Sequence, residues 1–317
     1  MNIERNPGMG LNLDWIESIQ VNKSATERRA ATLGTRRSVK KQNQVAWLLK
    51  AITLIDLTTL AGDDTEQRVK RLCAKAKNPL RHDLVEALAI ADLKLTTGAI
   101  CVYHDMLSTA ASCLKGTDIH LAAVSTGFPA GLTPMHLKIE EIKESVKAGA
   151  DEIDIVITRK HVFAENWQAL YDEVKAYREA CGEAHMKTIL STGEISTLRN
   201  VAKASMVCMM AGADFIKTST GKEAVNATLP VSLTMIRQIR EYHERTGFKV
   251  GYKPAGGISK AKEALVYLSM MKEELGNDWL EPELFRFGAS SLLGDIERQL
   301  EHQVTGHYSA AHRHAIG

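Results

Sequence analysis

Cysteine is scarce in this sequence, and the few cysteines present show no arrangement that would pair them. The 317 residues include five cysteines, an odd number, and they form no Cys-x-x-Cys motif. This pattern is typical of free thiols in a reducing compartment. The sequence therefore argues against a disulfide-stabilised secreted protein, and we expect a cytoplasmic location.

Long apolar runs are also missing. The longest stretch without Asp, Glu, Lys or Arg covers residues 119–137 and is interrupted by Gly, Pro, Ser and Thr, whereas a membrane-spanning helix needs about 20 mostly apolar residues. The first residues, Met1–Arg5, carry charge where a secretion signal has an apolar core. We therefore expect neither a membrane span nor a signal peptide.

A strong excess of one charge is missing from the chain as a whole. The 40 Lys and Arg oppose 38 Asp and Glu, and the net charge of +2 provides no general attraction to nucleic acid or membranes. One basic run is present: it comprises Lys23, Arg28, Arg29, Arg36, Arg37, Lys40 and Lys41. Such a run is most often a solvated helix face, and no aromatic residues are interleaved with it to stack on bases. We therefore expect no nucleic-acid partner.

From Val45 onward, short apolar runs alternate with longer amphipathic stretches. The expected strands are Ile52–Ile55, Ala99–Tyr103, Leu121–Ser125, Glu152–Ile157, Lys187–Leu190, Asp214–Ile216, Lys249–Tyr252 and Phe285–Phe287, and the expected helices include Thr65–Ala76, Leu137–Lys147, Trp167–Cys181 and Ala224–Tyr242. Near-continuous apolar strands are typical of parallel sheets covered on both faces. The alternation predicts an α/β fold, a (β/α)8 TIM barrel. A doubly wound open sheet is the alternative, and the absence of Gly-x-Gly-x-x-Gly after the first strand argues against it.

The sequence divides into three regions. We expect an N-terminal helical extension in residues 1–44, a catalytic barrel in residues 45–300 and a flexible C-terminal tail in residues 301–317. Leu11–Ile19 is predicted to form a short amphipathic helix in the extension. The tail holds four of the eleven histidines, and such an end is more often disordered than metal-binding.

Lys217 lies where a predicted strand changes into a loop. Phe215 and Ile216 before it favour extended backbone, whereas the residues after it are small and polar and end in Gly221. A lysine at the end of a buried strand loses solvation as a cation, so its pKa should fall and its neutral amine could attack carbonyl carbon. The alternative is a lysine that extends outward into solvent.

Asp154 lies inside a predicted strand, on the same face as Glu152. A carboxylate in apolar surroundings needs a cationic or hydrogen-bonding partner. One interpretation is an interior salt bridge with Lys187 or Lys253, which come from other predicted strands. The other is activation of an amine, because neighbouring ammonium groups lower each other's pKa and so favour Schiff-base chemistry.

Small residues follow the predicted seventh and eighth strands, which is the usual phosphate-binding position in TIM barrels. Backbone N–H groups and hydroxyls there could hold a phosphate dianion together with Lys222. These residues are Gly256, Gly257, Ser290 and Ser291. The alternative is a pair of ordinary tight turns. Lys222 belongs to no Walker A motif, because residue 216 is Ile where that motif has Gly.

Seven motifs together resemble the deoxyribose-phosphate aldolase family. They are Ile55–Thr59 (IDLTT), Ala99–Tyr103 (AICVY), Glu152–Asp154 (EID), Thr192–Glu194 (TGE), Phe215–Lys222 (FIKTSTGK), Gly251–Gly257 (GYKPAGG) and Phe287–Ser291 (FGASS). The resemblance covers roughly residues 45–300, and its motifs coincide with predicted strand ends. The N-terminal extension is similar to that of the longer eukaryotic-type members.

The resemblance implies a class I aldolase that needs no metal or other cofactor. It implies reversible cleavage of 2-deoxy-D-ribose 5-phosphate to D-glyceraldehyde 3-phosphate and acetaldehyde in deoxyribose phosphate catabolism. Lys217 would be the Schiff-base lysine, and Asp154 and Lys253 would relay protons beside it. The phosphate contacts would be Gly221, Lys222, Gly256, Gly257, Ser290 and Ser291, and Thr58 and Cys101 would line the pocket.

Two further expectations come from the same resemblance. In the family, the glycine pair is often followed by one Val or Ile and then by Arg, whereas this chain has Ser259 at the position of the Arg, followed by Lys260. Either the affinity for phosphate is lower in this chain, or Lys260 compensates for the missing arginine. A tail tyrosine, here Tyr308, could fold over the pocket and assist proton transfer. The alternative for Tyr308 is a disordered end.

Three other functions stay open at this point. The first is a Schiff-base aldolase for another sugar phosphate, and the second is a phosphate-binding barrel isomerase or synthase that uses Asp154 as a base without an imine. The third is a scaffold that binds partners through its basic extension, and the intact set of Asp154, Lys217 and Lys253 argues against it. Absence of His-Glu-x-x-His and of clustered ligands at strand ends predicts no metal site. The expected partners are small molecules, and a homo-oligomer is compatible with the sequence.

Overall fold

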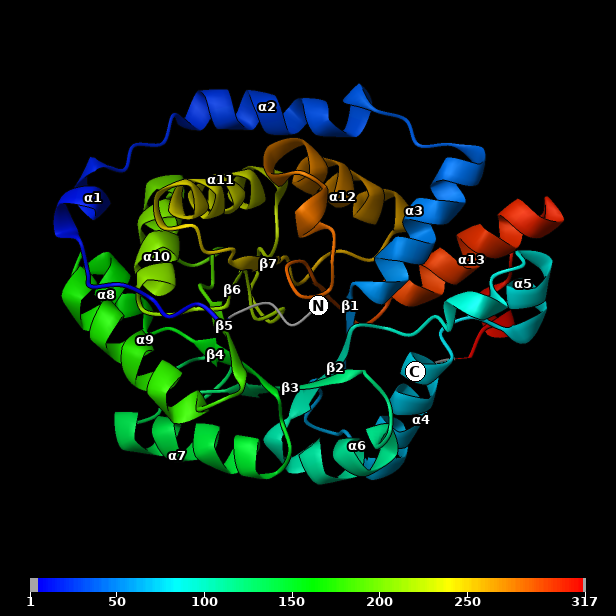
Figure 1. Cartoon of the computed structure of the whole chain (residues 1–317), viewed down its shortest axis with the longest axis horizontal. Helices are drawn as coiled ribbons and strands as arrows, with labels where there is room; N and C mark the ends of the chain where they lie inside the picture. Colours follow the sequence, from blue (N-terminus) through cyan, green and yellow to red (C-terminus); the bar gives the residue numbers. More distant parts are fainter. Residues whose placement is uncertain (1–4, 316–317) are drawn as a thin grey trace.

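The computed structural model describes residues 5–315 and contains a barrel of eight parallel strands ringed by helices (Figure 1). The strands are β1 (Ile55–Thr58), β2 (Ala99–Tyr103), β3 (His120–Ser125), β4 (Glu152–Val156), β5 (His185–Ile189), β6 (Phe215–Lys217), β7 (Gly251–Lys253) and β8 (Phe287–Ala289). They pair in the order β7-β6-β5-β4-β3-β2-β1-β8. Bridges between Tyr252 and Phe285 and between Ala255 and Gly288 join β7 to the β8 segment and close the ring. The predicted TIM barrel is confirmed.

Helices surround the barrel and connect successive strands. They are α1 (Leu13–Ser18), α2 (Lys23–Arg36), α3 (Lys41–Thr53), α4 (Glu66–Lys77), α5 (His82–Ala87), α6 (Leu107–Leu114), α7 (Met135–Lys147), α8 (Arg159–Phe163), α9 (Trp167–Cys181), α10 (Leu198–Met210), α11 (Leu229–Thr246), α12 (Ala261–Leu275) and α13 (Leu292–Thr305). None of the helices within residues 5–315 combines the length and apolarity that crossing a bilayer requires.

The two faces of each strand have different neighbours. In β4, the apolar Ile153 and Ile155 belong to the large hydrophobic core between strands and helices. The alternate residues, Glu152 and Asp154, are also buried, and successive side chains of a strand point to opposite faces. The acidic residues of β4 therefore point into the barrel, where they need cationic partners.

The structure corrects several predicted boundaries. The first strand was predicted at Ile52–Ile55, but α3 continues to Thr53 and β1 begins at Ile55. Buried apolar residues occur on both sides of this junction, so hydrophobicity alone does not separate the helix end from the strand. The helix predicted at Ala224–Tyr242 is α11, which begins later, at Leu229, because residues 218–228 form a loop.

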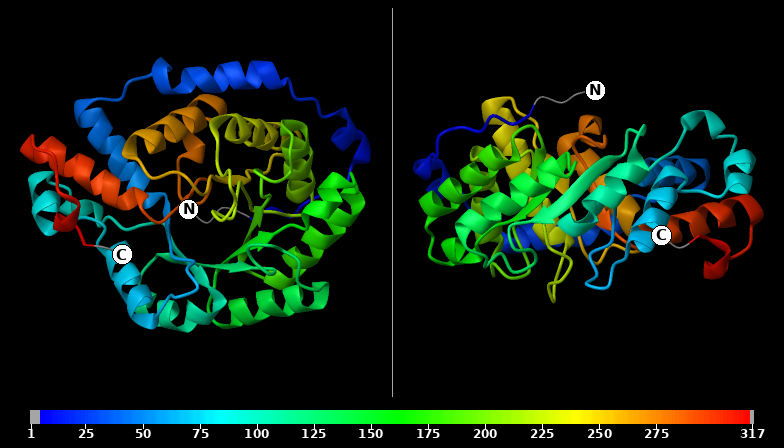
Figure 2. Two further views of the ribbon diagram at one scale, coloured as in Figure 1. Left: turned by 180° about the vertical axis from the view of Figure 1, so that it is seen from behind. Right: turned by 90° about the horizontal axis from the view of Figure 1, so that it is seen from below.

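The N-terminal segment packs against the barrel over most of its length. Asn6 is buried and its side chain donates to the carbonyl oxygens of Met209 (2.8 Å) and Ala213 (2.9 Å). Further along, α2 crosses the outer side of α11 and α12 (Figures 1 and 2). Arg29 of α2 forms an ion pair of 2.6 Å with Glu273 of α12. Part of the basic run is therefore occupied by contacts within the molecule.

The C-terminal residues lie along the end of α13. This helix continues to Thr305, beyond the predicted start of a flexible tail at residue 301. After it, Ser309 and His314 are buried, and His314 Nε2 lies 2.9 Å from Glu301 Oε2. The described part of the tail is thus docked on the helix that precedes it.

Candidate active site

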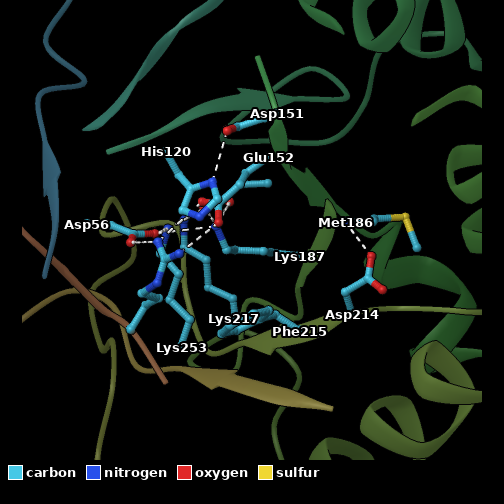
Figure 3. Close-up of polar contacts among 12 residues, drawn as sticks. Asp56, His120, Asp151, Glu152, Met186, Lys187, Asp214, Phe215, Lys217 and Lys253 are labelled. Atoms are coloured by element: carbon cyan, nitrogen blue, oxygen red, sulfur yellow. Dashed lines mark hydrogen bonds and ion pairs between the residues drawn. The ribbon is translucent and has the colours of Figure 1, made fainter. Parts of the chain in front are cut away.

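Lys217 is the last residue of β6 and points into the barrel (Figure 3). Only 3% of it is exposed to solvent. Its Nζ atom lies 2.7 Å from Oδ2 of Asp154, which comes from β4. The alternative of a lysine that extends into solvent is therefore wrong, because the amine is held inside the barrel by a carboxylate.

Lys253, the last residue of β7, binds the same carboxylate. Its Nζ atom lies 2.7 Å from Asp154 Oδ2 and also forms an ion pair with Asp56 of β1. The interior salt bridge considered for Asp154 is thus present, but it includes both Lys253 and Lys217. These three groups come from β4, β6 and β7, and they meet because alternate side chains of every strand point into the interior of the closed barrel.

The two lysines differ in their pKa values. Burial, with repulsion from Lys253, lowers the pKa of Lys217, although Asp154 opposes the shift. Burial also acts against a charged Lys253, but the pKa of Lys253 is raised because Asp154 and Asp56 both attract its proton. We expected each lysine to lower the pKa of the other; for Lys253 this was wrong, because it has two acidic partners. Lys217 therefore loses its proton more readily than Lys253 does.

A further set of buried charged residues lies next to this pair. Arg286 Nη1 is 2.6 Å from Asp56 Oδ1, and its Nη2 is 3.0 Å from Glu152 Oε1. Lys187 of β5 forms an ion pair with Glu152 and lies 3.6 Å from Asp56 Oδ2. Figure 3 shows the side chains of Lys187, Lys217 and Lys253 gathered near Asp56 and Glu152. Sequence reasoning gave no role to Asp56 or Arg286; the only signal was an arginine within the apolar run Leu284–Phe287.

A cavity of about 340 Å³ opens beside Lys217. Its lining includes every predicted phosphate contact: Gly221, Lys222, Gly256, Gly257, Ser290 and Ser291. Thr58 and Lys217 line the same cavity. The structure therefore brings the candidate nucleophile and the candidate phosphate contacts to one space at the C-terminal ends of the strands.

Backbone geometry at the cavity suits an anion. Gly256 and Gly257 have φ values of +77° and +81°, which glycine adopts readily. A Cβ atom on Gly256 would lie 2.6 Å from Cγ of Asn226, so a larger residue does not fit there. Ser291 is the N-cap of α13, and a helix N-terminus attracts negative charge through its free N–H groups and its dipole.

Two other residues considered in the sequence analysis, Cys101 and Lys260, do not line this cavity. Cys101 is fully buried and packs against Ala122 and Val124, so it approaches the lysines from within the barrel and does not line the cavity. Burial raises the pKa of its thiol to about 11. Lys260 lies 3.8 Å from Asp295 and lines a different cavity, while Ser259 lines the cavity beside Lys217. Compensation by Lys260 for the missing arginine therefore has no support in the structure.

The tail tyrosine is not at the cavity. Tyr308 is 90% exposed and stacks on His302, with ring centroids 5.0 Å apart. It follows the C-terminal end of α13, whereas the N-terminal end of that helix borders the cavity. Within residues 5–315, no group of three or more His, Cys, Asp or Glu residues is arranged to hold a metal ion.

Comparison with known proteins agrees with this geometry. Residues 50–296 match the model of the DeoC/LacD family of aldolases. The chain is 58% identical over 309 residues to human deoxyribose-phosphate aldolase, covering 97% of each chain, and 59% identical over 307 residues to the mouse protein, covering 96% of each.

A solved structure shows the same fold. Deoxyribose-phosphate aldolase from Aeropyrum pernix, described as a tetramer, superimposes with a TM-score of 0.58 at 19% identity, covering 88% of this chain and 99% of its own. The family match extends over most of the barrel, and the mammalian relatives match almost the whole chain. This chain therefore belongs to the DeoC/LacD family of aldolases.

Proposed function

We propose that this protein is a class I aldolase that reversibly cleaves 2-deoxy-D-ribose 5-phosphate to D-glyceraldehyde 3-phosphate and acetaldehyde, with Lys217 as the nucleophile. The observation that carries the proposal is a buried amine of lowered pKa that opens onto a cavity lined by Gly256, Gly257, Ser290 and Ser291. An exposed lysine, with a pKa of about 10.4, is less than about 0.1% neutral at pH 7. Burial beside Lys253 therefore increases the nucleophilic fraction.

In this mechanism, the amine of Lys217 attacks the C1 carbonyl carbon of the open-chain sugar. Loss of water gives a protonated imine, which accepts the electron pair released when the C2–C3 bond breaks. The C3 hydroxyl must lose its proton in that step, and Asp154, acting through a water molecule, is the proposed acceptor. Glyceraldehyde 3-phosphate leaves first. Protonation of the resulting enamine at C2 then regenerates an imine, and its hydrolysis releases acetaldehyde.

Lys253 is proposed to supply the proton at C2. Its ammonium group lies 2.7 Å from Asp154 and stays charged because two carboxylates bind it. It can pass a proton to the enamine through Asp154 or directly, and Asp154 can return one. The phosphate of the substrate would bind at the N-terminus of α13 and beside Lys222, which would place C1 near Lys217.

Trapping of the imine tests the nucleophile. Incubation with acetaldehyde and borohydride should add about 28 Da to the intact chain, as expected for reductive alkylation of one amine. Peptide mapping should place the added group on Lys217. Lys217→Arg should abolish both trapping and turnover, because arginine stays protonated, whereas Lys222→Ala should still be trapped. An adduct on Lys253 or Lys222, or full trapping of Lys217→Arg, would contradict the proposal.

A substrate comparison tests the phosphate site. The kcat/KM for 2-deoxyribose 5-phosphate should exceed that for 2-deoxyribose by at least about tenfold, which is the value of roughly one charge-assisted contact. Lys222→Ala should reduce this ratio. Equal kcat/KM values for the two sugars would remove the phosphate assignment, and a preference for another sugar phosphate would identify a different aldolase.

The cellular setting is a further part of the proposal. Products that enter triose phosphate and aldehyde metabolism fit a role in deoxyribose phosphate catabolism. All five cysteines are free, which supports a reducing, cytoplasmic location. Fractionation of cells with an antibody to the protein would test this location, and recovery in a membrane or organelle fraction would contradict it.

A further inference from the structure

The barrel interior holds seven buried charged or ionisable residues in one connected group. Three are carboxylates (Asp56, Glu152 and Asp154), and four are bases (Lys187, Lys217, Lys253 and Arg286). Each is at most 3% exposed. Ion pairs connect all seven, from Arg286 through Asp56 and Glu152 to Lys187, and from Asp56 through Lys253 and Asp154 to Lys217.

The charges in this group balance only when one of the four bases has lost its proton. Three ionised carboxylates oppose four bases, so the group with all four bases protonated would carry one uncompensated positive charge in the barrel interior. An uncompensated buried charge is strongly unfavourable. Arginine does not lose its proton, and Lys253 and Lys187 each contact two or more of the three carboxylates. Lys217 contacts only Asp154 among these carboxylates and is the base that gives up its proton at least cost.

We propose that Asp56, Glu152, Lys187 and Arg286 are positioning residues: together with Asp154 and Lys253 they form a set of three anions and three cations, which leaves no unpaired anion for a protonated Lys217 and so keeps Lys217 as a neutral amine in the resting enzyme. The inference rests on the proposed function of Lys217 as the imine-forming residue. When the amine and an aldehyde take up one proton and release one water, the protonated imine brings a positive charge into a group that was neutral. That charge is unfavourable in this interior, so the imine accepts electrons readily during C–C cleavage.

Other ionisable groups near these seven residues do not change the balance of positive and negative charge among them. Cys101 of β2 faces the lysines, and burial raises the pKa of its thiol to about 11, so it is uncharged at neutral pH. At the other end of the barrel, the pKa of His120 is raised by its hydrogen bond to Asp151, and the two form their own pair at 2.9 Å. Burial lowers the pKa of His185, which keeps its imidazole neutral. Lys222 lies on the solvent-exposed side of the cavity.

Substitutions that remove a cation and substitutions that remove an anion should shift the pKa of Lys217 in opposite directions. Lys187→Met removes a cation, so protonation of Lys217 restores the balance, and the pH midpoint of imine formation should rise by about one unit or more. Glu152→Gln removes an anion, so the midpoint should fall by a similar amount. The double variant removes one charge of each sign and should return to the wild-type midpoint. The measurement is the rate of acetaldehyde trapping by borohydride from pH 5 to pH 10, on the full chain.

Two controls separate charge from packing. Lys187→Arg keeps the cation and should keep the wild-type midpoint. Lys138→Met removes a buried lysine that pairs with Glu173 at 3.2 Å, outside the barrel interior, and should lower the thermal unfolding temperature without moving the midpoint. If Lys187→Met does not fold, Asp56→Asn supplies a second near-isosteric loss of an anion, and its midpoint should fall as that of Glu152→Gln does.

Any of three results would overturn the inference. The first is a set of midpoints that stay at the wild-type value in folded single variants. The second is a shift of Lys187→Met and Glu152→Gln in the same direction. The third is a double variant that does not return to the wild-type midpoint. Failure of the proposed function looks different, because in that case the wild-type enzyme itself would form no adduct on Lys217.

Discussion

Lys217 and Lys253 are chemically the same side chain, and their surroundings shift their pKa values in opposite directions. Both are buried and both bind Asp154, but only Lys253 also binds Asp56. The second carboxylate raises the pKa of Lys253, whereas burial lowers the pKa of Lys217. These opposite shifts fit the proposed mechanism, in which Lys217 is the nucleophile and Lys253 holds a positive charge and donates a proton.

Substitutions of Lys253 should distinguish two effects of this residue: the effect of its charge on the pKa of Lys217, and its proposed transfer of a proton. In Lys253→Met, Asp154 loses its second cation and attracts the proton of Lys217 more strongly, so the pKa of Lys217 rises. Because the neutral amine is the reactive form, activity is lost as pH falls through that pKa, and this acid limb should move to higher pH. We expect kcat at pH 7 to fall at least about a hundredfold, or roughly 3 kcal/mol, with partial recovery at pH 9.

Lys253→Arg is the matched variant for this test. It keeps the positive charge, so imine trapping should keep its wild-type pH dependence, but turnover should fall because guanidinium does not donate its proton. For both variants, the rate of borohydride trapping is measured as a function of pH and is compared with the steady-state turnover rate. An acid limb that stays in place in Lys253→Met would show that Lys253 does not control the protonation of Lys217.

The residues that the sequence indicated lie at strand ends or inside apolar strands. Lys217 was predicted because a lysine that ends a buried strand stands out against apolar neighbours, and Asp154 because it is a carboxylate inside an apolar strand; the family resemblance added the role of Lys253. Arg286 and the role of Asp56 were not predicted, because their pairing joins residues far apart in the sequence and depends on how the barrel closes. Arg286 also relies on Gly98, where a Cβ atom would lie 3.3 Å from its Nε; no local pattern in the sequence indicates such a fit.

At the scale of elements, the alternation of strands and helices in the sequence was enough to predict the fold, whereas the ends of individual elements were predicted less accurately. Helix α9 has the predicted bounds, Trp167–Cys181, because Asn166 caps its start and Gly182 follows its end. The bounds of β1 were wrong, because α3 and β1 are both buried and are separated only by Leu54. Capping residues therefore make the ends of a helix predictable from the sequence, whereas the boundary between two consecutive buried elements is not predictable from hydrophobicity.

The side chain of Glu223 helps to hold the loop after β6 in place. Glu223 accepts hydrogen bonds from the backbone N–H groups of Thr220 (2.8 Å) and Gly193 (3.1 Å). This carboxylate joins the loop that carries Gly221 and Lys222 to the loop after β5. The order of the phosphate site should therefore depend on Glu223, although it is not among the residues lining the cavity.

Glu223→Ala should loosen that loop and weaken substrate binding. We expect KM for 2-deoxyribose 5-phosphate to rise about tenfold, equivalent to roughly 1.4 kcal/mol and to one or two lost hydrogen bonds. Acetaldehyde has no phosphate, so the rate of imine trapping with acetaldehyde should stay unchanged. Glu244→Ala, an exposed position near the far end of α11, is the control and should change neither quantity. Loss of trapping in Glu223→Ala would show a role in the chemical step.

At the scale of the whole molecule, both described ends of the chain pack on the outside of the barrel. Asn6 reaches the start of β6, where its N–H donates to Asp214 at 3.0 Å, and α2 pairs with α12 through Arg29 and Glu273. The sequence suggested a separate extension, because its composition changes near residue 44. Contacts between distant segments are not visible in composition, so the docking of the extension appeared only in the structure.

The docked tail sets a limit on what Tyr308 can reach. Helix α13 has 14 residues and is therefore about 21 Å long, with its first turn beside the cavity. Residues 306–308 span at most about 10 Å when extended. Each residue that unwinds shortens the helix by about 1.5 Å and adds about 3.4 Å of extended chain. Tyr308 could therefore approach the cavity only if the last two or three residues of α13, or more, unwound, and this would release His314 from Glu301. We therefore expect the tail to support stability rather than catalysis.

Two variants test this role. Truncation after Thr305 removes the contacts of Ser309 and His314 with Glu301, and it should lower the free energy of unfolding by about 1–3 kcal/mol, because buried hydrogen-bond partners are lost. Tyr308→Phe keeps those contacts and should leave both stability and kcat at wild-type values. Urea unfolding measures the free energy of unfolding of both proteins, and steady-state kinetics measures their kcat. A lower kcat in Tyr308→Phe at unchanged stability would show that the tail leaves its docked position during turnover and brings the phenol to the substrate.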